Sequence, residues 1–135
     1  MESNAALRLL LVDDSKIDRS VVRRLLTRID PDIQIDEAAT ARAFCSSLKD
    51  REYDCVIVDH LLPGESGLDL IRNKLSPVKP PFPGVVVLTG TGDEMVAAEA
   101  IQSGAHEYMP KDNLKGEALY AAVLRACGCA SVQTR

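Results

Sequence analysis

Short apolar runs alternate with longer amphipathic segments along nearly the whole chain. The apolar runs are typical of strands, and the longer segments, in which apolar residues recur every three or four positions, are typical of helices. The predicted strands are Leu7–Val12, Ile33–Ile35, Cys55–Val58, Gly84–Leu88 and His106–Met109. This alternation predicts a parallel sheet with helices on both of its faces.

Residues of the ordinary capping types mark where the predicted helices begin and end. Ser15 is expected to cap the first helix, with Asp18 at the capping-box position, and Thr40 is expected to cap the second. In the first helix, the apolar residues at helical spacing are Ile17, Val21, Leu25 and Ile29. The later helices are expected near Leu68–Asn73, from Asp93 to Gly104 and from about Leu114 to Ala126, with a stiff proline-rich loop at Pro77–Pro83.

The expected order of the strands follows from how apolar each one is. Leu9–Val12, Val56–Val58 and Val85–Leu88 are almost wholly apolar, as interior strands buried on both faces are. The second strand is polar, and Pro110 lies beside the fifth, so these two strands are expected at the edges. With right-handed crossovers, the sequence predicts an α/β fold, a doubly wound, flavodoxin-like five-stranded parallel sheet of order 2-1-3-4-5.

Length and composition narrow the class of protein. The 135 residues are expected to form one domain, with a core at about 7–126 and a short C-terminal tail at 127–135. A net charge of −4 and the lack of Trp argue against direct nucleic-acid binding. No apolar run approaches the roughly 20 residues of a membrane span, and Met1–Ala6 does not resemble a signal peptide. We therefore expect no membrane insertion and a cytoplasmic location, with the four cysteines as reduced thiols.

Residues that carry chemistry follow four of the five predicted strands. They are Asp13, Asp14, Asp59, Thr89 and Lys111, and each comes just after the end of an apolar run. Because the carboxyl ends of parallel strands meet at one edge of the sheet, where ligands bind in such folds, these residues are expected to share a crevice.

The expected crevice has the composition of a site for phosphoryl transfer. Three close carboxylates repel one another, and a Mg²⁺ ion with oxygen ligands offsets that repulsion. Lys111 adds a fixed positive charge and Thr89 a hydroxyl donor, both suited to the peripheral oxygens of a phosphoryl group. An aspartate can itself be the nucleophile, and Asp59, alone after the central strand, is the predicted one.

The same residues resemble the receiver domain of two-component response regulators. The matching segments are the pair Asp13-Asp14, "VIVDHLLPGESG" with Asp59, "VVVLTGTGDE" with Thr89, and "GAHEYMPKDNL" with Tyr108 and Lys111. The resemblance covers about residues 7–126. It implies a phosphorylation-controlled signalling switch, in which Asp59 accepts a phosphoryl group from a histidine kinase or a phosphotransfer protein.

The resemblance also implies roles for individual residues. Asp14 and Asp59 would bind Mg²⁺ directly, Asp13 mostly through water, and the Leu61 backbone carbonyl would be a further ligand. Thr89 and Tyr108 would be the switch pair. They would relay phosphorylation to the surface of the fourth helix, fifth strand and fifth helix, where a second copy of the chain or a downstream effector would bind.

One departure and several alternatives remain at this point. In many receivers a proline follows the lysine, but here Pro110 precedes Lys111, so the aim of Lys111 is not fixed by resemblance. A Mg²⁺-dependent phosphatase would need a second acid where Leu61 stands, and a flavin-phosphate site would be repelled by the acidic pair after the first strand. We therefore expect that the protein is not an enzyme that acts on other substrates. It would catalyse only its own phosphorylation and dephosphorylation. The main alternative is a receiver-shaped interaction module that works without phosphorylation.

Overall fold

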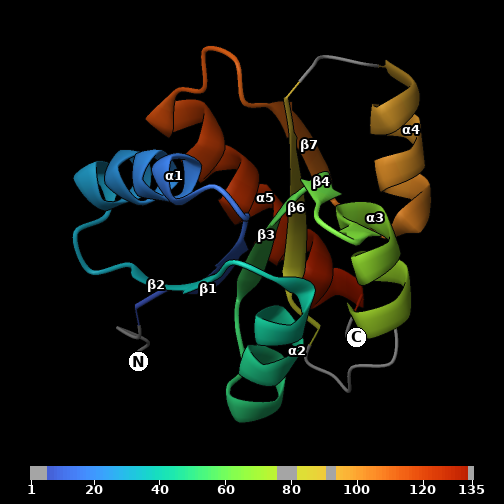
Figure 1. Cartoon of the computed structure of the whole chain (residues 1–135). Coiled ribbons are helices and arrows are strands. Elements are labelled where there is room, and N and C mark those ends of the chain that lie inside the picture. The colour runs from blue at the N-terminus through green and yellow to red at the C-terminus, as the bar shows by residue number, and fades with distance from the viewer. Residues whose placement is uncertain (1–5, 76–81, 91–93, 134–135) are drawn as a thin grey trace.

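A computed structural model describes residues 6–75, 82–90 and 94–133 (Figure 1). Its main strands are β1 (Arg8–Val12), β2 (Gln34–Ala38), β3 (Cys55–Asp59), β6 (Gly84–Thr89) and β7 (Glu107–Pro110). Its helices are α1 (Lys16–Ile29), α2 (Ala41–Asp50), α3 (Gly67–Leu70), which continues as a π-helical turn (Ile71–Leu75), α4 (Glu94–Ser103) and α5 (Gly116–Gln133). A small hairpin pairs β4 (Leu61–Leu62) with β5 (Glu65–Ser66). The order of main strands and helices is the predicted alternation.

The five main strands form one parallel sheet of order β2-β1-β3-β6-β7. Counted without the hairpin, this is the predicted order 2-1-3-4-5, so the fold class is confirmed. β1, β3 and β6 occupy the interior, and all residues of β3 and β6 are buried. The continuous apolar runs that predicted interior strands are therefore explained by helices on both faces.

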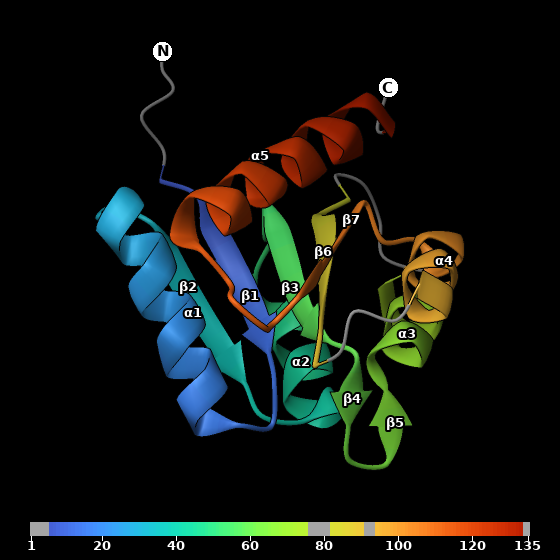
Figure 2. The same cartoon turned by 90° about the horizontal axis from the view of Figure 1, so that it is seen from above.

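The sheet separates two apolar cores. On one face, Val56 and Val58 of β3 pack with Phe44 of α2 and with residues of α3 and α4. On the other face, Cys55 and Ile57 pack with residues of α1 and α5. Figure 2 shows the same division, with α1 and α5 on one side of the strands and α2, α3 and α4 on the other. Alternate residues of one strand thus feed opposite cores.

The first helix is confirmed, but its buried stripe differs from the apolar spacing noted in the sequence. The buried residues are Val22 and Leu26, whereas Ile17 is 76% exposed and Val21 and Ile29 are also exposed. Two apolar stripes overlap along α1, and the sheet covers only one of them. An outer apolar strip on α1 remains open to solvent.

The capping residues mostly behave as predicted. The Ser15 hydroxyl accepts a hydrogen bond from the Asp18 N–H at 3.2 Å, and the Thr40 hydroxyl accepts one from the Ala43 N–H at 3.1 Å. Gly104 follows α4 with φ of +116°, a left-handed conformation that favours glycine. The predicted cap Asp93 lies outside the described residues, as do residues 76–81 of the predicted proline-rich loop.

Three features differ from the sequence prediction. The β4–β5 hairpin, which begins at Leu61, is not among the predicted strands, and its turn contains Gly64 at φ of +80°. The short helix near residue 70 ends in a π-helical turn. The last helix continues beyond Ala126 to Gln133, because no proline interrupts the segment and a single glycine in a helix is tolerated. In the described residues, no helix is long and apolar enough to cross a membrane.

Candidate functional site

The predicted site residues meet at the carboxyl ends of the strands. Asp13 directly follows β1, Asp59 is the last residue of β3, Thr89 is the last of β6, and Lys111 directly follows β7. Asp13, Asp59 and Thr89 are buried, which is unusual for such polar side chains. The strand order therefore brings together residues that lie up to 98 positions apart in the chain.

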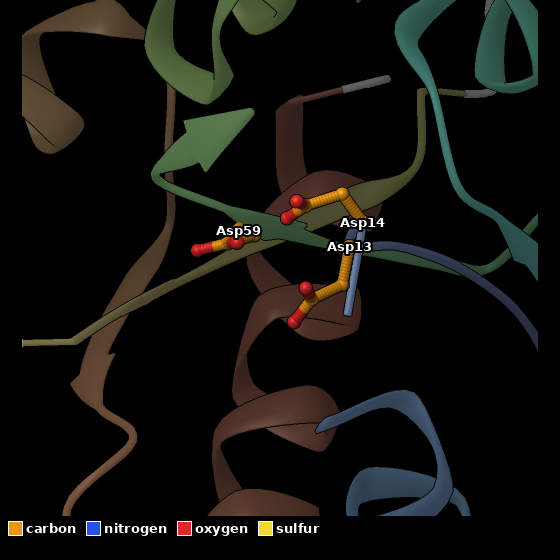
Figure 3. Close-up of side chains that lie close together, drawn as sticks. All are labelled: Asp13, Asp14 and Asp59. Carbon is orange, nitrogen blue, oxygen red and sulfur yellow. The ribbon is translucent and has the colours of Figure 1, made fainter. Parts of the chain in front are cut away.

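Three carboxyl groups form an acidic cluster at this edge (Figure 3). One oxygen each from Asp13, Asp14 and Asp59 lies within 4.8 Å of the other two. Asp14 is exposed, so the cluster is open to water on one side. The fit to a hard divalent cation rests on this donor set, because oxygen ligands with access to water are what Mg²⁺ requires.

The Lys111 ammonium lies among the acids. Its Nζ is 2.7 Å from Oδ2 of Asp13, 2.8 Å from Oδ2 of Asp18 and 3.5 Å from Oδ2 of Asp59. The loop after Pro110 thus directs the amine into the crevice, although the proline precedes the lysine. The backbone helps, because the Lys111 N–H donates to the Thr89 carbonyl. The amine sits on the same side of the sheet edge as the Asp59 carboxylate.

Charge and burial set the protonation of the central pair. Burial, together with the charge of Asp13, raises the pKa of Asp59 to about 6, against the lowering effect of Lys111. Burial alone would lower the pKa of Lys111, but hydrogen bonds to Asp13 and Asp18 raise it above the ordinary lysine value. At neutral pH the amine is charged and Asp59 is mostly ionised, as a nucleophilic carboxylate must be.

Backbone contacts fix the acids in place. Oδ1 of Asp13 accepts from the Ser15 N–H at 2.9 Å, and the Asp13 carbonyl accepts from the Arg19 guanidinium at 2.6 Å. Oδ1 of Asp59 accepts from the Leu61 N–H at 3.3 Å. A Cβ on Gly67 would collide with the Asp59 carbonyl oxygen, so the hairpin can pack against the end of β3 only with glycine there.

Thr89 and Tyr108 face the same side of the sheet. Val87 and Val85 of β6 belong to the core under α3 and α4, and strand alternation places Thr89 on their side. Tyr108 is half-buried, packs against that core and is paired in register with Val87. The predicted switch residues thus lie on adjacent strands, beside α4.

Two groups of contacts, one in the site and one beside it, were missed by sequence reasoning. Asp18 has the position of a capping-box acid, yet its carboxylate binds Lys111. Arg19 and Arg23, whose position is typical of a solvated helix face, both bind Glu37 at the end of β2. Neither contact leaves a local signal, because each partner lies on a different element.

The chain is similar to known signalling proteins over most of its length. Residues 9–124 match the model of the response regulator receiver domain. The chain is 32% identical over 104 residues to Protein PetR of Rhodobacter capsulatus, covering 76% of this chain and 41% of PetR. It is 30% identical over 114 residues to the methanogenesis regulatory protein FilR1 of Methanothrix harundinacea, covering 82% of this chain and 25% of FilR1. The chain therefore spans less than half the length of these curated relatives.

A solved structure has the same architecture. A response regulator protein from Burkholderia pseudomallei, determined with a phosphorylated aspartic acid, a calcium ion and citrate, superposes with a TM-score of 0.76 at 23% identity. The match covers 95% of this chain and 72% of that one. This likeness shows the fold and agrees with the parallel sheet described above.

Proposed function

Because the chain belongs to the response regulator receiver domain family of two-component signalling, we propose that it is a phosphorylation-controlled switch with Asp59 as the phosphoryl acceptor. The observation that carries the proposal is the Lys111 ammonium 3.5 Å from a buried Asp59 carboxylate, within a cluster of acids. A nucleophile, a counter-ion and metal-binding oxygens are then present in one crevice.

The phosphoryl group would come from a phosphohistidine of a histidine kinase or phosphotransfer protein. An oxygen of the Asp59 carboxylate forms a bond to phosphorus as the bond from phosphorus to the histidine nitrogen breaks. The nitrogen keeps the electron pair and takes a proton. With a pKa of about 6, Asp59 is mostly ionised at neutral pH, and its burial leaves it less solvated than a surface carboxylate.

The acidic cluster would hold the Mg²⁺ ion that the transfer requires. Asp13, Asp14, Asp59 and the Leu61 backbone carbonyl are the proposed ligands, with Asp13 acting mostly through water. Bound there, Mg²⁺ supplies positive charge for the oxygens of the moving phosphoryl group. The Burkholderia pseudomallei protein, determined with a calcium ion and a phosphorylated aspartic acid, supports a fold that takes a divalent cation and an aspartyl acceptor.

Lys111, Thr89 and Tyr108 would convert phosphorylation into a change of surface. The Lys111 amine and the Thr89 hydroxyl would bind phosphoryl oxygens, since both groups donate hydrogen bonds at the same strand edge. Inward movement of Thr89 would give Tyr108 room to turn inward beside α4. The surface of α4, β7 and α5 would then bind a second copy of the chain or a downstream effector. Met95 and Ile101 of α4 are exposed and suit such a contact.

The exposed strip on α1 supports docking of the phosphoryl donor. Ile17 and Val21 are exposed in the helix that begins beside Asp13 and Asp14. An apolar surface next to a reactive crevice suits a helical partner that carries the phosphohistidine. The donor would thus cover the crevice and exclude water during transfer.

Phosphorylation by a small donor tests the assignment. With acetyl phosphate and Mg²⁺, the wild-type chain should gain the mass of one phosphoryl group, and the modification should be labile to hydroxylamine. Asp59→Asn should abolish the gain, because the amide is not a nucleophile, whereas the exposed-acid control Asp32→Asn should be modified normally. Mass spectrometry reads both outcomes. Labelling of Asp59→Asn would overturn the acceptor assignment, and failure of the wild type with phosphohistidine donors as well would favour the phosphorylation-independent interaction module.

A further inference from the structure

Asp18 forms an ion pair with Lys111 that the proposed phosphoryl switch does not explain. Its Oδ2 is 2.8 Å from Nζ, as close as the 2.7 Å contact to Asp13, whereas Asp59 is 3.5 Å away. The shortest bonds of the amine therefore go to two acids that do not accept the phosphoryl group. Asp18 comes from the first turn of α1, 93 positions from Lys111 in the chain.

The local structure leaves the Asp18 carboxylate free to reach the amine. In a complete capping box, the acid would bind the N–H of the capping residue. Here the Ser15 N–H is bound by Asp13 instead, while the Ser15 hydroxyl fixes the Asp18 N–H. The backbone of Asp18 is thus held, and its side chain extends from the helix to Lys111.

The two strong partners of Lys111 differ in how easily they release it. The Asp13 side chain is 1% exposed, so losing its bond to the amine would leave a buried charge without its counter-ion. The Asp18 side chain is 42% exposed, so water can replace the amine at little cost. Asp18 is therefore the partner that can give up Lys111.

We propose that Asp18 is a positioning residue: it acts as a releasable counter-ion that holds Lys111 in the unphosphorylated chain and competes with the phosphoryl group on Asp59 for the amine. This inference rests on the proposed function, because it assigns regulation of the same site. The ion pair with Asp18 stabilises the resting state, and the phosphorylated state must offset its loss. The residue thereby sets how far phosphorylation shifts the switch.

Removing the charge of Asp18 has two separable effects on an anion bound at Asp59. It frees Lys111 to bind the anion, and it removes a nearby negative charge. The first effect requires the amine, whereas the second does not. A double-mutant cycle with Lys111 therefore distinguishes competition for the amine from simple charge repulsion.

The experiment measures binding of beryllofluoride, a phosphoryl mimic, in the presence of Mg²⁺ by calorimetry. Asp18→Asn should bind it roughly three- to five-fold more tightly than the wild type, the upper part of the range for one partly exposed ion pair. Asp112→Asn, which removes an exposed acid next to Lys111 in the chain, is the matched control and should stay within about two-fold. In the Lys111→Met background, the gain from Asp18→Asn should fall to that of the Asp112→Asn control, because only the removal of a negative charge is left.

The ammonium ¹⁵N signal of Lys111 gives a second readout that does not depend on tight binding by the Lys111 variant. Beryllofluoride should shift this signal in the wild type, and Asp18→Asn should shift it before any ligand is added. An unshifted signal in Asp18→Asn would overturn the inference. So would unchanged or weaker beryllofluoride binding, an equal gain in Asp112→Asn, or a gain that is just as large without Lys111. A wild type that binds no beryllofluoride would instead overturn the proposed function, and this inference with it.

Discussion

The interior strands β3 and β6 have very different surroundings at their two ends. Their carboxyl ends carry Asp59 and Thr89, which are polar and buried. Their other ends are Cys55 and Gly84, which are paired in register and buried under α5. A Cβ on Gly84 would lie 2.5 Å from the carbonyl carbon of Ala126, so helix and strand are in direct backbone contact there.

The two ends of the interior strands therefore contribute differently: the Gly84 end contributes stability, and the Asp59 end holds the proposed reactive residues. At the Gly84 end, close packing leaves no room for an added atom, so that end contributes dispersion and apolar burial. At the Asp59 end, burial of charge costs free energy, which Lys111 and the N–H groups of Ser15 and Leu61 offset in part. We infer that the packed end stabilises a fold that tolerates an electrostatically unfavourable resting site.

The largest expected effect comes from adding a methyl group at Gly84, where β6 packs against α5. Gly84→Ala should lower the free energy of unfolding by about 3 kcal/mol, because the new methyl group meets backbone atoms of α5 that have no rotamer with which to move. Urea denaturation measures the loss. Beryllofluoride affinity of the folded variant should stay at the wild-type value, since the site lies at the other end of the strand.

Gly128, a glycine of α5 itself, provides the control for this substitution. Gly128 is exposed and has no atom within 4 Å of an added Cβ, so Gly128→Ala should stabilise the chain by up to about 1 kcal/mol through helix propensity. Equal stability of Gly84→Ala and the wild type would show that α5 can move away from the sheet. The division between the two ends would then be wrong.

The next largest effect is a pH dependence of the free energy of unfolding. It comes from Asp59 at the charged end, which is the carboxyl end of β3 and β6. Folding raises the pKa of Asp59 from an ordinary 3.8 to about 6, so between these values the folded chain binds more protons than the unfolded chain. The free energy of unfolding should therefore fall as pH rises from 4 to 6, by on the order of 2 kcal/mol from this group. The loss is complete by about pH 7, where Asp59 is mostly ionised in both states.

The comparison with Asp59→Asn isolates that contribution. Without added metal, the variant should lack this part of the pH dependence and should be more stable than the wild type at pH 7, because the amide carries no charge to bury. Urea denaturation in chelator at several pH values gives both curves. Parallel curves would mean that Asp59 titrates normally in the folded chain and that the charged end is not under strain.

The sequence predicted the fold and most of the site because both depend on repeated, chain-wide patterns. Continuous apolar runs identified the interior strands, and the topology of parallel sheets placed Asp13, Asp59, Thr89 and Lys111 at one edge. The structure brings these four residues together as expected. Their individual roles stay predictions, which the phosphorylation experiment tests.

What the sequence did not predict depends on contacts between distant elements. The contact between Asp18 and Lys111 was missed because a capping position already explained the acid locally. The buried stripe of α1 was not identified because Val22 and Leu26 alternate with an equally apolar stripe, and only docking on the sheet decides between them. Gly84 gave no signal, because its role depends on the backbone of α5.

The smallest expected effect tests whether Lys111 offsets the free-energy cost of burying the carboxylates at the charged end. Without metal, Lys111→Met should lower the free energy of unfolding by only about 1 kcal/mol, less than the loss usually seen for a broken buried ion pair. The reason is that Asp59 can take up a proton in place of the amine. The pKa of Asp59, followed by NMR of its carboxyl carbon, should therefore rise above the wild-type value of about 6.

Mg²⁺ should compensate for the missing amine. In the wild type, Lys111 and the cation compete for the oxygens of Asp13 and Asp59, so Mg²⁺ gains affinity when the amine is removed. Millimolar Mg²⁺ should raise the melting temperature of Lys111→Met by more than that of the wild type, and it should return the pKa of Asp59 to a low value. Equal shifts in both proteins, or an unchanged pKa of Asp59 in the variant, would mean that the amine is not the charge that balances this end of the sheet. The cost of burying Asp59 would then be offset by its hydrogen bond from the Leu61 N–H and by the packing of the opposite end.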